Sequence, residues 1–290
     1  MSIAPVFRAN SSANKEIACR LKAALQSPLL AKHCKKDYAS SFTKIGLTKE
    51  HAKRLSDQVA LTIKEEPTIN QIEHRVYALF SGTKVKGISF LETIDAKMAG
   101  RADIIFNQIK PHLTKIKGKV IDFGAGDGQI SQRVRDKLNL TVDAYDINPF
   151  KSPLTKITVH PFNGKKIPQP KKSYEAAIIT NVMHHEKNNE NIIKELTRIV
   201  RRRLVVIETV PVGRTKAEIK LDRERTFYND CLWNVFFHYA RIPVPGTYET
   251  PDGWIHRFKK YGWECTYSKN LGVDQPTIAD THHLLVFNKE

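Results

Sequence analysis

A glycine-rich stretch that follows a hydrophobic run is the part of this sequence with the clearest chemistry. Residues 120–129 read Val-Ile-Asp-Phe-Gly-Ala-Gly-Asp-Gly-Gln, so a predicted strand leads into Gly124, Gly126 and Gly128. Glycines let a chain turn sharply and approach a ligand closely, because a Cβ would collide with it. The spacing is G-x-G-x-G and Gln129 follows, so the dinucleotide pattern G-x-G-x-x-G is not met. A pyrophosphate is therefore not the favoured ligand.

The same stretch resembles the first motif of class I S-adenosylmethionine-dependent methyltransferases, D-x-G-x-G-x-G, with Asp122 at its start. The resemblance implies that the three glycines lie against S-adenosylmethionine and that Asp122 lies near its amino-acid end. It also implies an α/β fold with a doubly wound, mostly parallel seven-stranded sheet. Because glycine-rich turns also occur in doubly wound folds without this cofactor, the assignment needs further motifs.

Two polar residues follow the next predicted strands. Asp146 comes directly after residues 141–145, where a carboxylate can accept hydrogen bonds from both ribose hydroxyls of an adenosine. Asn163 lies in Phe-Asn-Gly-Lys-Lys-Ile-Pro, which is similar to a D-G-x-x-(I/L)-P segment that places an Asp near the adenine in some small-molecule methyltransferases. An Asn can still accept from an exocyclic amine. The resemblance thus implies that Asp146 and Asn163 contact the cofactor.

Residues 174–185, Tyr-Glu-Ala-Ala-Ile-Ile-Thr-Asn-Val-Met-His-His, resemble the fourth strand of the family, usually F-D-x-(V/I) leading to L-H-H. Glu175 replaces the usual Asp, and Asn181 is a further predicted cofactor contact. Arg201–Arg203 stands where the family has a Pro-Gly-Gly turn. We expect a solvent-exposed turn there.

The two histidines at the end of this segment are the candidate catalytic residues. Methyl transfer from a sulfonium is an in-line displacement that depends on alignment, but oxygen and carbon acceptors usually also need a base. His185 is the predicted base, and His184 is a predicted cofactor-pocket contact and the second catalytic candidate. The alternative is that the pair only shapes the pocket.

The sequence after the predicted fourth strand lacks both the (D/N)-P-P-aromatic signature of adenine-N6 enzymes and the cysteine of cytosine-C5 enzymes, which disfavours those two classes.

An aromatic-rich insertion at about 209–250 is predicted to be a substrate lid, because small-molecule methyltransferases have one in that region and aromatic cavities suit small ligands. Its predicted substrate-binding residues are Trp233, His238 and Arg223. Arg223 suits the carboxylate or phosphate of an anionic acceptor. The competing interpretation is that Trp233 and the phenylalanines at i+3 and i+4 form one buried helix face.

The elements that position these residues change in character along the chain. From residue 119, short apolar runs alternate with amphipathic helices, which is typical of a parallel sheet covered on both faces. We expect strands at 120–123, 141–145, 157–159, 176–180, 204–207, 264–268 and 283–288, and helices at 130–138, 189–200 and 251–261. Upstream we expect helices around 17–25, 52–63 and 69–80, the last with Thr68 and Gln71 as a capping box, and a helix from 90 to about 113. Residues 1–88 are therefore predicted to be a helical lid or docking module, and 89–290 the S-adenosylmethionine-binding domain.

The composition limits the cellular setting. With 41% hydrophobic and 27% charged residues, the chain can form a globular core. It contains no apolar leader and no run near the roughly 18 residues of a membrane span, so we expect a cytoplasmic protein without a membrane partner. A transit peptide stays open because the first forty residues are basic. The four cysteines match no zinc-ligand spacing, and we predict no metal.

The net charge of +17 leaves several partners open. Residues 1–118 carry 20 Lys/Arg and 10 Asp/Glu, which favours an anionic partner but is also ordinary for a basic protein. No Lys/Arg run is interleaved with aromatic residues, so nucleic acid is not the favoured partner.

We expect a methyltransferase that acts on oxygen or carbon of a small molecule. The alternatives are an RNA methyltransferase that docks through its basic N-terminal region, and a non-catalytic cofactor-binding protein, which Asn163 and Glu175 keep open. The oligomeric state is not determined by the sequence.

Overall fold

The computed structural model describes residues 12–149, 155–237, 242–273 and 279–289. Contacts divide the chain into two compact units, each made of separate segments. The helical unit comprises Met1–Gly100, Pro211–Gly246 and Val273–Asp280, and the sheet unit comprises Arg101–Val210, Thr247–Gly272 and Thr281–Glu290. Most of the insertion at 209–250, which was predicted to be a substrate lid, is thus part of the helical unit. The predicted division near residue 88 stays a prediction.

The sheet unit is built on a seven-stranded sheet within the described ranges, in the order β5-β4-β3-β6-β7-β9-β8. The strands are β3 (Val120–Phe123), β4 (Val142–Asp146), β5 (Val159–Pro161), β6 (Tyr174–Thr180), β7 (Val200–Thr209), β8 (Glu264–Val273) and β9 (Thr281–Asn288). The neighbouring strands β5, β4, β3, β6 and β7 are all parallel, and β9 is antiparallel to β7. The strand order reverses at β3, where doubly wound sheets bind ligands. The predicted α/β architecture with a doubly wound, mostly parallel seven-stranded sheet is confirmed.

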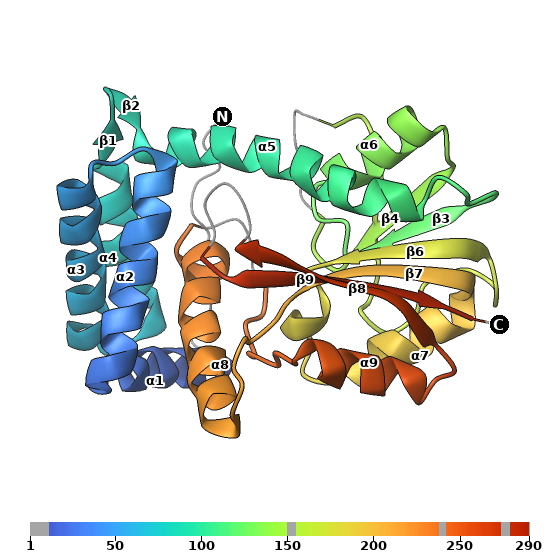
Figure 1. The fold of residues 1–290 in the computed structure, drawn as a ribbon. Coiled ribbons are helices and arrows are strands. Elements are labelled where there is room, and N and C mark those ends of the chain that lie inside the picture. The colour runs from blue at the N-terminus through green and yellow to red at the C-terminus, as the bar shows by residue number, and fades with distance from the viewer. Residues whose placement is uncertain (1–11, 150–154, 238–241, 274–278, 290) are drawn as a thin grey trace. The chain divides into compact units, whose positions relative to one another are not determined.

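Helices cover both faces of this sheet (Figure 1). They are α6 (Gln129–Leu138), α7 (Asn189–Ile199), α9 (Pro251–Lys259) and the second half of α5 (Phe90–Ile109), with short 3-10 turns η1 (Lys110–His112) and η2 (Met183–His185). Successive strand residues point to opposite faces. Val120 and Val205 accordingly pack with α5 and α6, whereas Ile121 and Val206 pack with α7 and α9. Both faces of the central strands are therefore buried.

Each strand predicted from the sequence recurs, although β6, β7, β8 and β9 are longer than expected and β5 overlaps the expected range 157–159 only at Val159. β8 continues to Val273, and β7 begins at Val200 instead of residue 204. The expected turn at Arg201–Arg203 is wrong, because these residues belong to β7. Arg203 pairs with Ala176 of β6 and with Asn288 of β9. Three consecutive arginines are typical of a turn, but here the strand extends beyond the helices that cover its central part.

The helical unit contains the remaining described elements. They are α1 (Ser12–Gln26), α2 (Pro28–Ile45), α3 (Lys49–Glu65), α4 (Ile69–Ser81), the hairpin of β1 (Lys84–Val85) and β2 (Ile88–Ser89), the first half of α5, α8 (Lys216–Cys231) and the π-helical turn η3 (Leu232–Phe236). The predicted cap of α4 is present, since Thr68 Oγ1 accepts from the backbone N–H of Gln71 at 3.3 Å. Phe80 lies at the centre of the core, with ring centroids 4.7 Å from Phe237 and 5.7 Å from Phe42. Within the described ranges, none of the helices has the length and hydropathy of a bilayer span.

Candidate cofactor and catalytic site

The glycine loop connects β3 to α6 at the carboxyl edge of the sheet. Gly124, Gly126 and Gly128 have φ angles of +80°, +57° and +78°, a region that other residues enter at a cost. A Cβ on Gly124 would lie 2.3 Å from Val182 Cγ2, and one on Gly128 would lie 2.4 Å from Ile157 Cγ2. Only glycine therefore fits at these two positions.

Asp146 holds the glycine loop from the end of β4. Its Oδ2 accepts the Gly126 N–H at 2.8 Å, and its Oδ1 accepts the Asn148 N–H at 2.8 Å. Each carboxylate oxygen has a second lone pair, so Asp146 can still accept a hydroxyl proton. The acidic side chain and the loop predicted to bind one ligand are thus joined directly.

Asp122 lies fully buried on β3 below the loop. Its Oδ2 accepts from Ser131 Oγ at 2.5 Å, while its Oδ1 has no hydrogen-bond partner among the described residues. Burial, with a smaller contribution from the charges of Asp146 and Asp127, raises the pKa of Asp122 to about 7 against the opposing bond from Ser131. An unsatisfied buried oxygen beside a loop that admits no side chain fits a cofactor with a cationic amino-acid end.

The raised pKa of Asp122 predicts a pH dependence of wild-type stability that the substitution Asp122→Asn removes. The pKa of Asp122 is raised on folding, so its contribution to stability is present at acidic pH and is lost as the pH rises towards about 7. Each unit of pKa shift corresponds to about 1.4 kcal/mol. We expect wild-type stability to fall between pH 5 and pH 8, and the Asn variant to be more stable than wild type at pH 8 by a few kcal/mol. Urea unfolding across this range measures both.

Asp136→Asn serves as the matched control, because the exposed Asp136 pairs with Arg135 and its pKa is lowered by that bond. Its unfolding curve between pH 5 and pH 8 should run parallel to that of wild type. A parallel curve for Asp122→Asn as well would contradict the burial argument.

Asn163 follows β5 on an exposed turn. Its Oδ1 accepts the backbone N–H groups of Lys165 and Lys166 at 2.9 and 3.0 Å. The carbonyl oxygen predicted to accept from an adenine amine is thus bonded to its own turn, as short polar side chains in turns often are. The cofactor role of Asn163 stays a prediction.

The segment after β6 lies against the glycine loop, as the close approach of Val182 to Gly124 shows. Asn181 begins it with a φ of +55°, and its N–H donates to the Ile207 carbonyl of β7 at 2.8 Å. Turn η2 then carries His184 and His185, whose ring centroids are 4.0 Å apart. His184 is buried and His185 is half-buried. The glycine loop and the segment that carries the predicted histidines are therefore neighbours in the sheet unit.

Glu208, near the end of β7, organises this segment and was not identified from the sequence as a site residue. Its Oε1 accepts the N–H groups of Val182 and Met183 at 2.9 and 2.8 Å, and its Oε2 lies 2.6 Å from His184 Nδ1. Burial raises the pKa of Glu208, but the charge and hydrogen bond of His184 and the two backbone donors outweigh it and the net pKa is lowered. Glu208 is thus an ionised acceptor inside the protein. The sequence did contain a signal for this residue, namely a single Glu directly after a hydrophobic predicted strand.

The predicted substrate residues belong to the other unit. Trp233 lies on η3 and Arg223 on α8, both in the helical unit, while His238 lies outside the described residues. Trp233 is 8% exposed and its ring centroid lies 4.9 Å from that of Phe237, which agrees with a buried helix face. Arg225 is held by Asp37 through both carboxylate oxygens. The substrate-binding role of Arg223 stays a prediction.

Comparison with known proteins places the chain in a family. A family model described as a methyltransferase domain matches residues 86–268, which is more than half of the chain. The chain therefore belongs to the methyltransferase-domain family. It is a class I enzyme whose methyl donor is S-adenosylmethionine. No curated protein matches the sequence.

Several solved structures are similar in fold. The cyclase SpnF matches with a TM-score of 0.49 and 12% identity over 64% of this chain and 80% of that chain. An S-adenosylmethionine-dependent methyltransferase from Methanosarcina mazei matches with 0.45 and 18% over 61% and 95%. A phosphoethanolamine N-methyltransferase from Haemonchus contortus, in complex with phosphomonomethylethanolamine and S-adenosylhomocysteine, matches with 0.46 and 10% over 63% and 52%. Because these TM-scores are below 0.5, the assignment rests on the family match and the strand order.

Proposed function

We propose that this methyltransferase transfers the methyl group to an oxygen or carbon atom of a small molecule, with His185 as the base. S-adenosylmethionine supplies an activated methyl group on a sulfonium. Gly124, Gly126 and Gly128 would accommodate it, Asp146 would accept its ribose hydroxyls, and Asp122 would face its amino-acid end. The observation that carries the proposal is the η2 segment, which presents two histidines beside the glycine loop and is held there by Glu208.

The two histidines are assigned different roles. His184 is fixed by its 2.6 Å contact to Glu208 and by a Thr247 Oγ1 that donates to its carbonyl at 3.0 Å. It is a positioning residue. The half-buried His185 would take the proton of the acceptor as the oxygen or carbon bonds to the methyl group and the carbon–sulfur bond breaks, leaving a neutral thioether.

A small acceptor is favoured over RNA by the chemistry of the η2 segment. The η2 segment carries neither a cytosine-type nucleophile nor an amino-methyltransferase signature. In the helical unit, Trp233 Nε1 is a buried donor without a partner among the described residues. Such an indole N–H suits a polar atom of a ligand. The substrate-binding roles of Trp233 and Arg223 stay predictions.

The base assignment predicts a large loss of turnover in His185→Gln. General-base catalysis typically contributes about a hundredfold or more. We expect kcat with the identified acceptor to fall about a hundredfold, S-adenosylmethionine affinity to stay within about twofold, and the rising limb of the wild-type pH–rate profile to disappear. A variant with unchanged kcat would show that the histidine only shapes the pocket.

The acceptor itself is found with tritiated S-adenosylmethionine, offered with small-molecule extracts and separately with total RNA. Label in a small product supports the proposal. Label in RNA alone would replace it with an RNA methyltransferase, and cofactor binding without transfer to either pool would indicate a non-catalytic protein.

A further inference from the structure

The edge of the sheet opposite the glycine loop is rich in basic side chains. Basic residues precede β3 and β6, begin β7 and follow β9, which ends at this edge because it runs antiparallel. In Figure 1 this edge lies on the side where the C-terminus is marked. We define the amino-edge patch as Lys119, Lys171, Lys172, Arg201, Arg202 and Lys289.

Hydrogen bonds link four of the six patch residues in two pairs. The Arg201 guanidinium donates to the Lys172 carbonyl, and the Lys289 N–H donates to the Arg202 carbonyl at 2.9 Å. Burial lowers the pKa of Lys289, and the charge of Lys172 lowers it further. The two ammonium groups are thus close enough to repel each other.

Few carboxylates neutralise the patch. Asp143 lies 3.7 Å from Lys119 and Glu175 lies 3.6 Å from Arg201, and pairs of this kind at the surface are weak. The other four patch residues make no ion pair with any residue in the described ranges. A concentrated positive surface of this kind attracts a polyanion.

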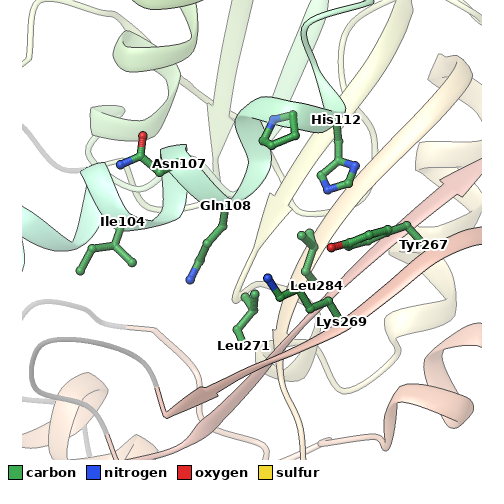
Figure 2. Close-up of a pocket in the computed structure, with 9 residues that line it drawn as sticks. Ile104, Asn107, Gln108, His112, Tyr267, Lys269, Leu271 and Leu284 are labelled. Carbon is green, nitrogen blue, oxygen red and sulfur yellow. The ribbon is translucent and has the colours of Figure 1, made fainter.

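A pocket of about 520 Å³ lies between α5 and the strands β8 and β9 of the same unit. Figure 2 shows the ring of Tyr267 below that of His112, and their centroids are 4.6 Å apart. Asn107 and Gln108 project from α5, and Lys269 comes from β8. The exposed ring of Tyr267 and the Gln108 amide, which can both donate and accept, suit the face and edge of a nucleobase.

The pocket and the patch residue Arg202 lie on either side of the amino end of β7, because Arg202 and Arg203 point to opposite faces of the sheet. Arg203 directly follows the patch residue Arg202, and its Nη1 donates to the His112 carbonyl at 3.0 Å. Burial and then the charge of Arg203 lower the pKa of His112, which favours a neutral ring. A strand that crosses the amino end of β7 would place a base in the pocket and its phosphates along the patch.

We propose that the amino edge of the sheet unit binds single-stranded nucleic acid, with a base stacked against Tyr267 and the backbone along the amino-edge patch. A duplex would not offer an unstacked base to Tyr267. The site lies at the edge opposite the glycine loop, so the bound strand is a docking partner and not, through this contact, the methyl acceptor. The proposal goes beyond the proposed function and does not depend on it.

Charge and composition favour nucleic acid over an anionic membrane. Apart from Tyr267, none of the large exposed hydrophobic side chains among the described residues lies at this edge. Among the described residues that line the pocket, Tyr267 is the one large hydrophobic residue that is exposed, at 39%. Peripheral membrane binding usually combines charge with an inserted apolar face, which this edge does not offer.

The test uses the full chain and a fluorescein-labelled oligoadenylate RNA of about twelve nucleotides, followed by anisotropy at low salt. The patch variant is Lys171→Glu, Lys172→Glu and Arg202→Glu combined. Its control is Lys36→Glu, Lys53→Glu and Lys64→Glu, three exposed lysines of the helical unit that give the same change of charge. We expect the patch variant to bind about a hundredfold more weakly with a shallower salt dependence, and the control to stay within about threefold of wild type.

Stacking is tested separately at Tyr267. Tyr267→Ala is expected to bind about tenfold more weakly, whereas Tyr267→Phe keeps wild-type affinity. Titration with S-adenosylmethionine shows that the variants are folded. The proposal is overturned if wild type does not bind the RNA, if patch and control variants weaken equally, or if the control weakens more. Patch-dependent binding to phosphatidylserine vesicles with unchanged RNA binding would overturn it as well.

Discussion

Glu208→Ala is expected to lower the free energy of unfolding by roughly 5 kcal/mol, the largest stability loss we predict for a single substitution in the sheet unit. The change removes the acceptor of two backbone N–H groups and of His184 Nδ1, all in a fully buried environment. Each buried polar group left without a partner costs about 1–3 kcal/mol. Because the η2 segment then loses its anchor, methyl transfer should be lost as well. Urea unfolding at pH 7 measures the stability term.

Glu208→Gln separates the charge from the hydrogen bonds. Its carbonyl oxygen can still accept from Val182 and Met183, but its amide must donate to His184 Nδ1, which selects the other tautomer of the imidazole. We expect the Gln variant to lose less stability than the Ala variant and yet to have strongly reduced turnover. Equal stability of the Ala variant and wild type would show that Glu208 does not hold the segment.

Gly126→Arg and Asp146→Ala are expected to abolish binding of S-adenosylmethionine. An arginine at a φ of +57° strains the backbone and places a long side chain in the turn. Asp146→Ala removes the acceptor of the Gly126 N–H and the predicted acceptor of the ribose hydroxyls. Two hydrogen bonds to a charged group correspond to a loss of about a hundredfold or more in affinity. Calorimetric titration with S-adenosylmethionine and S-adenosylhomocysteine measures it.

Gly262→Arg is the matched control. Gly262 also has a positive φ, +77°, but a Cβ there would meet no atom within 4 Å. It should bind S-adenosylmethionine like wild type. If Gly126→Arg retained wild-type affinity while folding normally, the glycine loop would not be the cofactor site.

The central strands and the glycine loop were predictable because local sequence determines them. Hydrophobic runs such as Val120–Phe123, followed by three glycines, specify both the strand and the turn after it. Asp146 was predictable for the same reason, since it lies where a parallel strand ends. The position of Trp233 on a buried face also followed from helix spacing.

Long-range pairing was not predictable. Glu208 contacts His184 from a neighbouring strand, and a sequence shows no pairing between residues that far apart. The Oδ1 of Asn163 accepts a backbone N–H of its own turn, so this bond competes with the predicted bond to a ligand, and the sequence does not reveal it. The aromatic and basic residues of the amino edge come from separate segments, so no run in the sequence interleaves them. The arginines of β7 lacked the apolar periodicity by which strands are recognised.

The interleaved segments of the two units also determine when the protein can fold during its synthesis. The helical unit needs residues up to Asp280, and the sheet unit needs β9, which inserts between β7 and β8 and is completed only at Asn288. Domains made of one continuous segment can fold while the ribosome is still translating the next domain. Here nearly all of the 290 residues must have left the ribosome before either unit can close. Until then β7 has no partner on one side, and the nascent chain presents an open strand edge that a chaperone would need to shield.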